Sequence, residues 1–203
     1  MKWEEALEIW GIKKIKLLST ATNGLESEKH RLLGVFLKDT TDPEISVSLH
    51  KTTGLELMQS EKYHMISSSL MDLRGLSTEA FKKELEEQLE GVDVIFTYNL
   101  PFQYSFLQAL YEGEFPYKLY DLLQVEKALR QKYAFDEEQM AIFPSFHATC
   151  CMEISPTSVV KTCKHLGISK VPAPGQLPAV KMLDVLQQIY SSVSSSDIQL
   201  FQS

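Results

Sequence analysis

The sequence has few cysteines, no long apolar run and no internal repeat, and these shortages narrow the possible functions. Three cysteines, an odd number, do not make a disulfide framework in a chain of 203 residues. Nowhere do the roughly 18 consecutive apolar residues occur that a membrane-spanning helix requires. His147, Cys150, Cys151, Cys163 and His165 lack the paired spacing typical of a closed structural zinc site. We therefore expect a protein of the reducing cytoplasm that holds no zinc and crosses no membrane.

Positive charge is also scarce. The formal net charge is −7 at pH 7, whereas proteins that bind phosphate groups usually carry a basic face or stripe. The lysines are interspersed with acids, apart from two thin clusters: Lys13, Lys14 and Lys16, and Lys161, Lys164 and Lys170. This balance disfavours tight non-specific binding of nucleic acid and leans toward a protein partner. Binding of a single-stranded nucleic-acid end or a nucleotide stays open.

What the chain does contain suits one globular α/β domain. It is 44% hydrophobic and 23% charged, enough to build one core but not a second large domain. We expect an N-terminal helix over residues 1–11, a single domain over 12–190 and a serine-rich C-terminal tail over 191–203 that frays.

The first half of the chain predicts a helix followed by three strands. Apolar residues recur at helical spacing from Trp3 to Trp10, and Gly11 can end that helix. The segments 12–19 and 31–39 have the composition of strands. In 45–50 apolar and polar residues alternate, which predicts a half-exposed strand. Short connections between the three favour an antiparallel meander.

The second half predicts helices around one buried strand. Ser77 can cap a helix that buries Phe81, Leu85 and Leu89 and ends at Gly91. Residues 92–97 predict a strand buried on both faces. Helices are predicted near 102–110, over 117–133, at 159–166 and from Pro178 onward, with an irregular stretch over 134–156. The order predicts an α/β fold with a mixed central sheet flanked by helices.

Three segments, in order, resemble the three motifs of the DEDD-type (DEDDh-like) 3′–5′ exonucleases, which have the ribonuclease H-like fold. STATNGL, residues 19–25, is similar to their first motif, DTETTGL. YNLPFQ, residues 98–103, is similar to HN-x-x-FD, and QLPAVKM, residues 176–182, to H-x-A-x-x-DA. The segments 74–91 and 162–168 continue the likeness between the motifs. The resemblance implies the exonuclease fold over most of the chain.

The same resemblance implies that the catalytic residues are gone. The four metal-binding acids of the family fall on Ser19, Ala21, Gln103 and Lys181, and the general-base histidine falls on Gln176. Such enzymes use two divalent ions to stabilise the attacking and leaving oxygens, and Mg²⁺ prefers carboxylate oxygen. Neutral side chains and a lysine supply no such ligands. We expect a catalytically inactive, exonuclease-like protein without a metal cofactor.

The resemblance also indicates a cleft that can still bind a ligand. Its candidate residues are Thr20, Thr22, Asn23, Tyr98, Asn99, Phe102 and Lys181. The Lys181 ammonium could stand in for a metal and hold phosphate, or could simply reach solvent at the rim. The expected ligand is a nucleic-acid end, a nucleotide or a protein partner.

An alternative stays open. The chain could be an active exonuclease that binds Mg²⁺ or Mn²⁺ through relocated acids such as Asp39, Asp42, Asp121 or Asp184. The competing interpretation of these aspartates is that they cap helices and turns.

Overall fold

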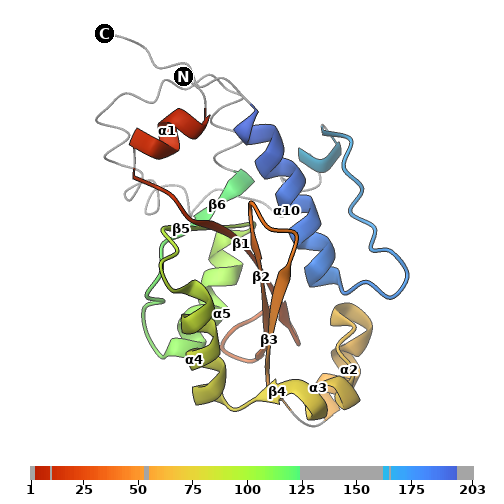
Figure 1. Cartoon of the computed structure of the whole chain (residues 1–203). Coiled ribbons are helices and arrows are strands. Elements are labelled where there is room, and N and C mark those ends of the chain that lie inside the picture. The colour runs from red at the N-terminus through yellow and green to blue at the C-terminus, as the bar shows by residue number, and fades with distance from the viewer. Residues whose placement is uncertain (1–2, 10, 53–54, 124–161, 165, 196–203) are drawn as a thin grey trace.

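The computed structural model describes residues 3–9, 11–52, 55–123, 162–164 and 166–195 (Figure 1). These residues form a six-stranded sheet in the order β4-β3-β2-β1-β5-β6. The strands are β1 (Ile15–Thr22), β2 (Leu32–Asp39), β3 (Ile45–His50), β4 (Gly75–Leu76), β5 (Val94–Thr97) and β6 (Leu119–Asp121). β1, β2 and β3 form an antiparallel meander, whereas β4, β5 and β6 pair in parallel with their neighbours. The predicted mixed sheet is confirmed.

Helices cover both faces of the sheet. The helices α4 (Thr78–Leu89) and α5 (Leu100–Tyr111) lie on one side, and α10 (Pro178–Ser194) lies on the other (Figure 1). Neighbouring residues of β1 serve different cores, because alternate side chains of a strand point to opposite faces. Leu17 packs in the core with α10, and Leu18 packs in the core with α4 and α5.

The predicted N-terminal elements are present with shifted ends. The helix α1 (Trp3–Ile9) precedes Gly11, which has φ +68°. β1 begins three residues later than predicted, because the N–H groups of Lys13 and Lys14 donate to the Asp93 carboxylate and not to a neighbouring strand. It also continues to Thr22 and so carries the whole first motif as far as the turn.

The prediction of a half-exposed β3 is wrong at its second half. Ser48 and His50 are buried, because α4 covers the face that the alternation assigned to solvent. The Ser48 hydroxyl donates to the Glu84 carboxylate at 2.6 Å, and His50 Nε2 lies 3.0 Å from the Thr78 hydroxyl. Ser48 and His50 therefore lie inside the protein, each with a partner on α4.

The helix α4 confirms its predicted cap and face. The Ser77 hydroxyl accepts a hydrogen bond from Ala80 N, and Phe81, Leu85 and Leu89 are fully buried. The helix α10 confirms its start at Pro178 but extends to Ser194, into the stretch predicted to fray. Val193, which is buried, holds that last turn against the protein.

Two regions differ from the prediction. The helices α2 (Leu55–His64) and α3 (Ser68–Arg74) and the short β4 were not predicted. The helix predicted over 117–133 is wrong at its start, because Leu119–Asp121 pairs in parallel with β5 as strand β6. Residues 124–133 and the irregular stretch 134–156 lie outside the described residues. Residues 162–164 and 166 are helical, as predicted.

Within the described ranges, no helix is both long enough and apolar enough to span a membrane.

Candidate functional site

A cleft of about 820 Å³ opens where β1 ends. The end of β1 and the loop after it form one wall, α2 forms another, and the start of α10 closes a third side. Tyr98 and Phe102 contribute from the junction between β5 and α5. The lining residues are Thr20, Ala21, Thr22, Asn23, Gly24, Leu25, Lys29, His30, Gln59, Ser60, Tyr63, His64, Tyr98, Phe102, Pro178, Ala179 and Met182. Residues from all three segments that resemble the exonuclease motifs therefore line this cleft.

The structure brings five of the seven candidate residues to this cleft: Thr20, Thr22, Asn23, Tyr98 and Phe102. Asn99 does not line it and instead begins α5 in a left-handed conformation, φ 48° and ψ 55°. Lys181 does not line it either. Burial raises the pKa of the Cys163 thiol, and the charges of Lys170 and Lys181 oppose that rise.

Of the four positions that the sequence resemblance aligns with acids, three hold neutral side chains and the fourth is Lys181. Ser19 is fully buried on β1, and its hydroxyl makes no hydrogen bond with the described residues. Next to it, the Thr20 hydroxyl donates to Gln103 Oε1 at 2.6 Å, a buried bond that joins β1 to α5. Ala21 lines the cleft with a methyl group. These side chains offer hydroxyl, amide and apolar groups, with no negative charge among them.

Gln176, which the sequence resemblance aligns with the general-base histidine, has a structural role. Gln176 Nε2 donates to the Asp184 carboxylate at 2.7 Å, and its Oε1 accepts from Ala173 N at 3.1 Å. This side chain therefore ties the turn before α10 to the second turn of that helix. Gln176 does not line the cleft.

The sequence resemblance aligns Tyr98 with another histidine of the exonuclease motifs. Burial raises the pKa of its phenol, and the adjacent Gln103 side chain opposes part of that rise. The phenol is therefore protonated at neutral pH and can donate a hydrogen bond. Because Tyr98 lines the cleft, it brings an aromatic side chain to a ligand there.

The α2 wall was missed by the sequence analysis. Gln59, Ser60, Tyr63 and His64 line the cleft from one side of this helix. His64 Nδ1 accepts from Ile66 N at 2.9 Å, so the neutral ring carries its proton on Nε2, 3.0 Å from the Ser60 hydroxyl. Ser60 in turn donates to Leu57 O at 3.2 Å. His64 therefore holds the end of α2 and cannot act as a base toward Ser60.

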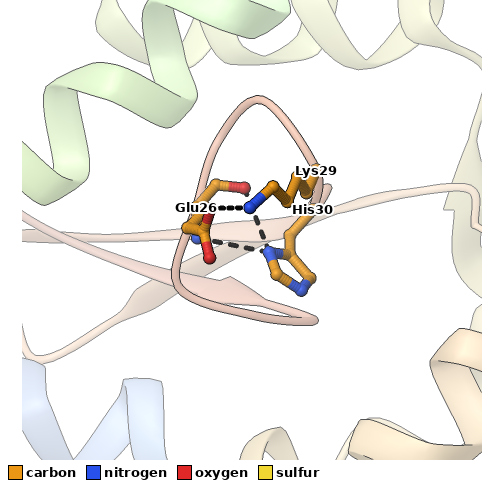
Figure 2. Close-up of polar contacts among 3 residues, drawn as sticks. All are labelled: Glu26, Lys29 and His30. Atoms are coloured by element: carbon orange, nitrogen blue, oxygen red, sulfur yellow. Dashed lines mark hydrogen bonds and ion pairs between the residues drawn. The ribbon is translucent and has the colours of Figure 1, made fainter.

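The loop between β1 and β2, residues 23–31, is compact. Its two ends meet where Arg31 N donates to Asn23 Oδ1 at 2.6 Å. Inside it, Lys29 forms an ion pair with Glu26, and His30 Nδ1 lies 3.2 Å from Glu26 N (Figure 2). The His30 ring lies directly on Gly24, where a Cβ atom would come within 2.0 Å of His30 Cδ2. This glycine belongs to the sequence motif, but packing explains it here.

The acids considered as relocated metal ligands are engaged elsewhere. Asp39 accepts from Thr41 N and Asp42 from Glu44 N, both in turns. Asp121 accepts from Leu100 N and Leu123 N, and Asp184 from Gln176. No Asp or Glu is among the described residues that line the cleft, and the described part of the chain contains no group of three His, Cys, Asp or Glu side chains placed to hold a metal ion. Of the five residues weighed as zinc ligands, only Cys163 is described.

Comparison with known proteins places the fold. No protein-family model and no curated protein sequence matches the chain. Among solved structures, E. coli exonuclease I in complex with a dT13 oligonucleotide superposes with a TM-score of 0.57 at 16% identity, over 89% of this chain and 40% of that one. The chain has the ribonuclease H-like exonuclease fold.

Two further structures share this exonuclease fold over more of their own length. The structure of the yeast NOT1 MIF4G domain co-crystallized with CAF1 gives a TM-score of 0.56 at 14% identity, over 93% of this chain and 82% of that one. Exonuclease X in complex with 5′ overhanging duplex DNA gives 0.50 at 14% identity, over 89% and 92%. The chain spans less than half of the exonuclease I chains that it matches.

Proposed function

We propose that this chain is a non-catalytic binding module that takes the end of a single-stranded nucleic acid into the cleft without a metal ion. The observation that carries the proposal is the make-up of the cleft. The cleft has a volume of about 820 Å³, and its lining includes three aromatic residues, Tyr63, Tyr98 and Phe102, and one lysine, Lys29. No carboxylate is among the described lining residues. A metal-binding exonuclease site would have the reverse character.

The aromatic residues give the cleft its affinity for bases. Tyr98 and Phe102 line the cleft from the junction of β5 and α5, and Tyr63 lines it from α2 with 70% of its surface exposed. Stacking of a base on an aromatic side chain contributes about 1–3 kcal/mol and tolerates any base. The Thr22 hydroxyl donates to Gly24 O, so its oxygen can accept a hydrogen bond from a sugar hydroxyl.

Hydrolysis is not part of the proposal. In-line attack on a phosphodiester of this kind needs two ions held by carboxylates and a base to take the proton from water. Ser19, Ala21 and Gln103 provide no charge where the family has acids, and Gln176 is bound to Asp184. Restored activity would require ligands that the described residues do not bring together.

The fold relatives are consistent with two kinds of partner. Exonuclease I and exonuclease X were solved with an oligonucleotide and with DNA, and CAF1 was solved with a protein domain. The aromatic lining favours nucleic acid as the ligand of this cleft. Three exposed or half-buried rings line it, and bases can stack on such rings.

The test is a binding titration with a fluorescent oligothymidylate of eight nucleotides, in EDTA and again in Mg²⁺ or Mn²⁺. We expect binding in EDTA, no shortening of the strand with metal, and a rise in melting temperature with ligand, because a ligand that binds only the native state stabilises it. Tyr63→Ala should weaken binding about tenfold. Leu73→Ala is the matched control, because Leu73 is 81% exposed but lies outside the cleft.

Three outcomes would contradict the proposal. Strand shortening with Mn²⁺ would show an active exonuclease with relocated ligands. Equal loss of binding in Tyr63→Ala and Leu73→Ala would place the ligand elsewhere. No response to strand, nucleotide or metal would leave a protein partner as the function of this fold.

A further inference from the structure

A second hollow of about 270 Å³ borders the β1–β2 loop. It is lined by Ser27, Glu28, Lys29, His30, Arg31, Leu32, His50, Phe106, Ala109 and Leu110. Lys29 and His30 line both this hollow and the cleft, whereas Glu28 and Arg31 line only the hollow. The loop therefore borders both spaces, and we call it the divider.

This divider is held in place from within. Arg31 N and O bond to Asn23, His30 N donates to Glu26 O at 2.8 Å, and the Thr22 hydroxyl donates to Gly24 O at 2.7 Å. With Glu26 tied to Lys29 and His30 (Figure 2), these two side chains and the backbone of the loop are held relative to the cleft. A ligand that leaves the cleft over Lys29 and His30 meets the hollow next.

Arg31 is the residue of the hollow best suited to bind an anion. Arg31 is exposed and makes no ion pair with any described residue, whereas Lys29 is paired with Glu26. Burial lowers the pKa of His50, and the charge of the nearby Arg31 lowers it further, so the imidazole beneath the hollow is neutral. Glu28 is the opposing charge at the rim. A guanidinium donates in a fork that matches two phosphate oxygens.

We propose that the hollow binds the phosphodiester backbone of the same single strand whose end occupies the cleft, with Arg31 as its phosphate contact. This inference rests on the proposed function. Arg31 alone would bind a free phosphate only weakly, because the Glu28 carboxylate also lines the hollow. A phosphate tethered to a base already in the cleft binds at a high effective concentration, so a weak contact contributes to affinity.

The test compares thymidine monophosphate with oligothymidylates of two, four and eight nucleotides, in EDTA at two salt concentrations. For the unmodified chain, affinity should rise with length and then level off once the strand reaches the hollow. Arg31→Ala should leave the monophosphate unchanged, weaken the longer strands about tenfold, and reduce the slope of log affinity against log salt by about 0.7. Glu28→Gln should strengthen the same strands. Lys13→Ala, at the opposite end of β1, is the control of equal charge.

The outcomes separate this inference from the function on which it rests. If the strands bind and gain affinity with length but Arg31→Ala and Glu28→Gln behave like Lys13→Ala, the second contact is wrong and the cleft stands. If affinity does not depend on length, the hollow is again excluded and the cleft alone binds. If neither monophosphate nor strand binds, both proposals are wrong.

Discussion

At the scale of single residues, the end of β1 is shaped by packing as well as by motif. Gly24 matches a glycine of the exonuclease pattern, yet in this chain the His30 ring fills the space beside it. Gly113 offers a contrast, since the nearest atom to a Cβ there is Tyr111 O at 4.0 Å. A Cβ atom therefore fits at Gly113 but not at Gly24.

We therefore predict that Gly24→Ala lowers the free energy of unfolding by about 1–3 kcal/mol, the usual range for overpacking. Gly113→Ala should change it by less than about 0.5 kcal/mol. Urea unfolding measures both. In the double variant Gly24→Ala/His30→Ala most of the loss should return, and a double variant as unstable as the single one would show that the ring is not the obstacle.

At the scale of elements, α5 begins without a cap of its own. Asn99 precedes it in a left-handed conformation and makes no side-chain hydrogen bond to the helix. The carboxylate of Asp121, at the end of the neighbouring β6, accepts from Leu100 N at 3.1 Å and from Leu123 N at 2.9 Å. The negative charge of this carboxylate near the N-terminus of α5 also interacts favourably with the helix dipole and stabilises the helix.

Asp121→Ala should lower the free energy of unfolding by about 1–3 kcal/mol, because it leaves buried N–H groups without a partner. Asp42→Ala is the comparison, since Asp42 accepts from Glu44 N in an exposed turn and should change stability by less than about 0.5 kcal/mol. Equal losses in the two variants, measured by denaturant unfolding, would be at odds with a capping role for Asp121.

The elements also show which features the sequence could predict. The strands β1, β2, β3 and β5 and the helices α4 and α10 were predictable, because apolar residues mark their buried faces. The helix α2 escaped because part of its buried side is polar, with Ser60 and His64 bonded to each other. β6 has only three residues, too few for a period, and its apolar residues fit a helical pattern equally well.

The candidate site divides in the same way. Thr20, Thr22, Asn23, Tyr98 and Phe102 line the cleft because strand ends and helix starts carry the resemblance, and their part in binding stays a prediction. Lys181 was expected to project into the cleft, but α10 turns Pro178, Ala179 and Met182 toward it. Lys29, His30 and the α2 residues stand in segments outside the motifs, so only the three-dimensional arrangement brings them to the cleft.

At the scale of the whole molecule, two buried histidines tie stability to pH. Burial is the main cause that lowers the pKa of both His50 and His64 from the ordinary value of 6.5. Below about pH 6.5 the unfolded chain therefore binds protons that the folded chain does not, and stability falls as pH falls. The hydrogen bonds from Lys13 N and Lys14 N lower the pKa of Asp93 from 3.8, so its contribution is lost only in more acidic solution.

We predict that the free energy of unfolding decreases from pH 7.5 to pH 5.5, measured by urea titration. His64→Gln should be less stable than the parent at pH 7.5, because the Ile66 N–H loses its ring acceptor, and should depend less on pH. A parent protein with constant stability over this range would contradict neutral, buried histidines.

The shared position of Lys29 and His30, between the cleft and the hollow, has a thermodynamic consequence. A ligand in the cleft that moves either side chain changes the free energy of binding in the hollow. Linkage requires that this effect be equal in both directions. The nine-residue loop would then act as a coupling element, through which the length of a bound strand is sensed at its terminal base.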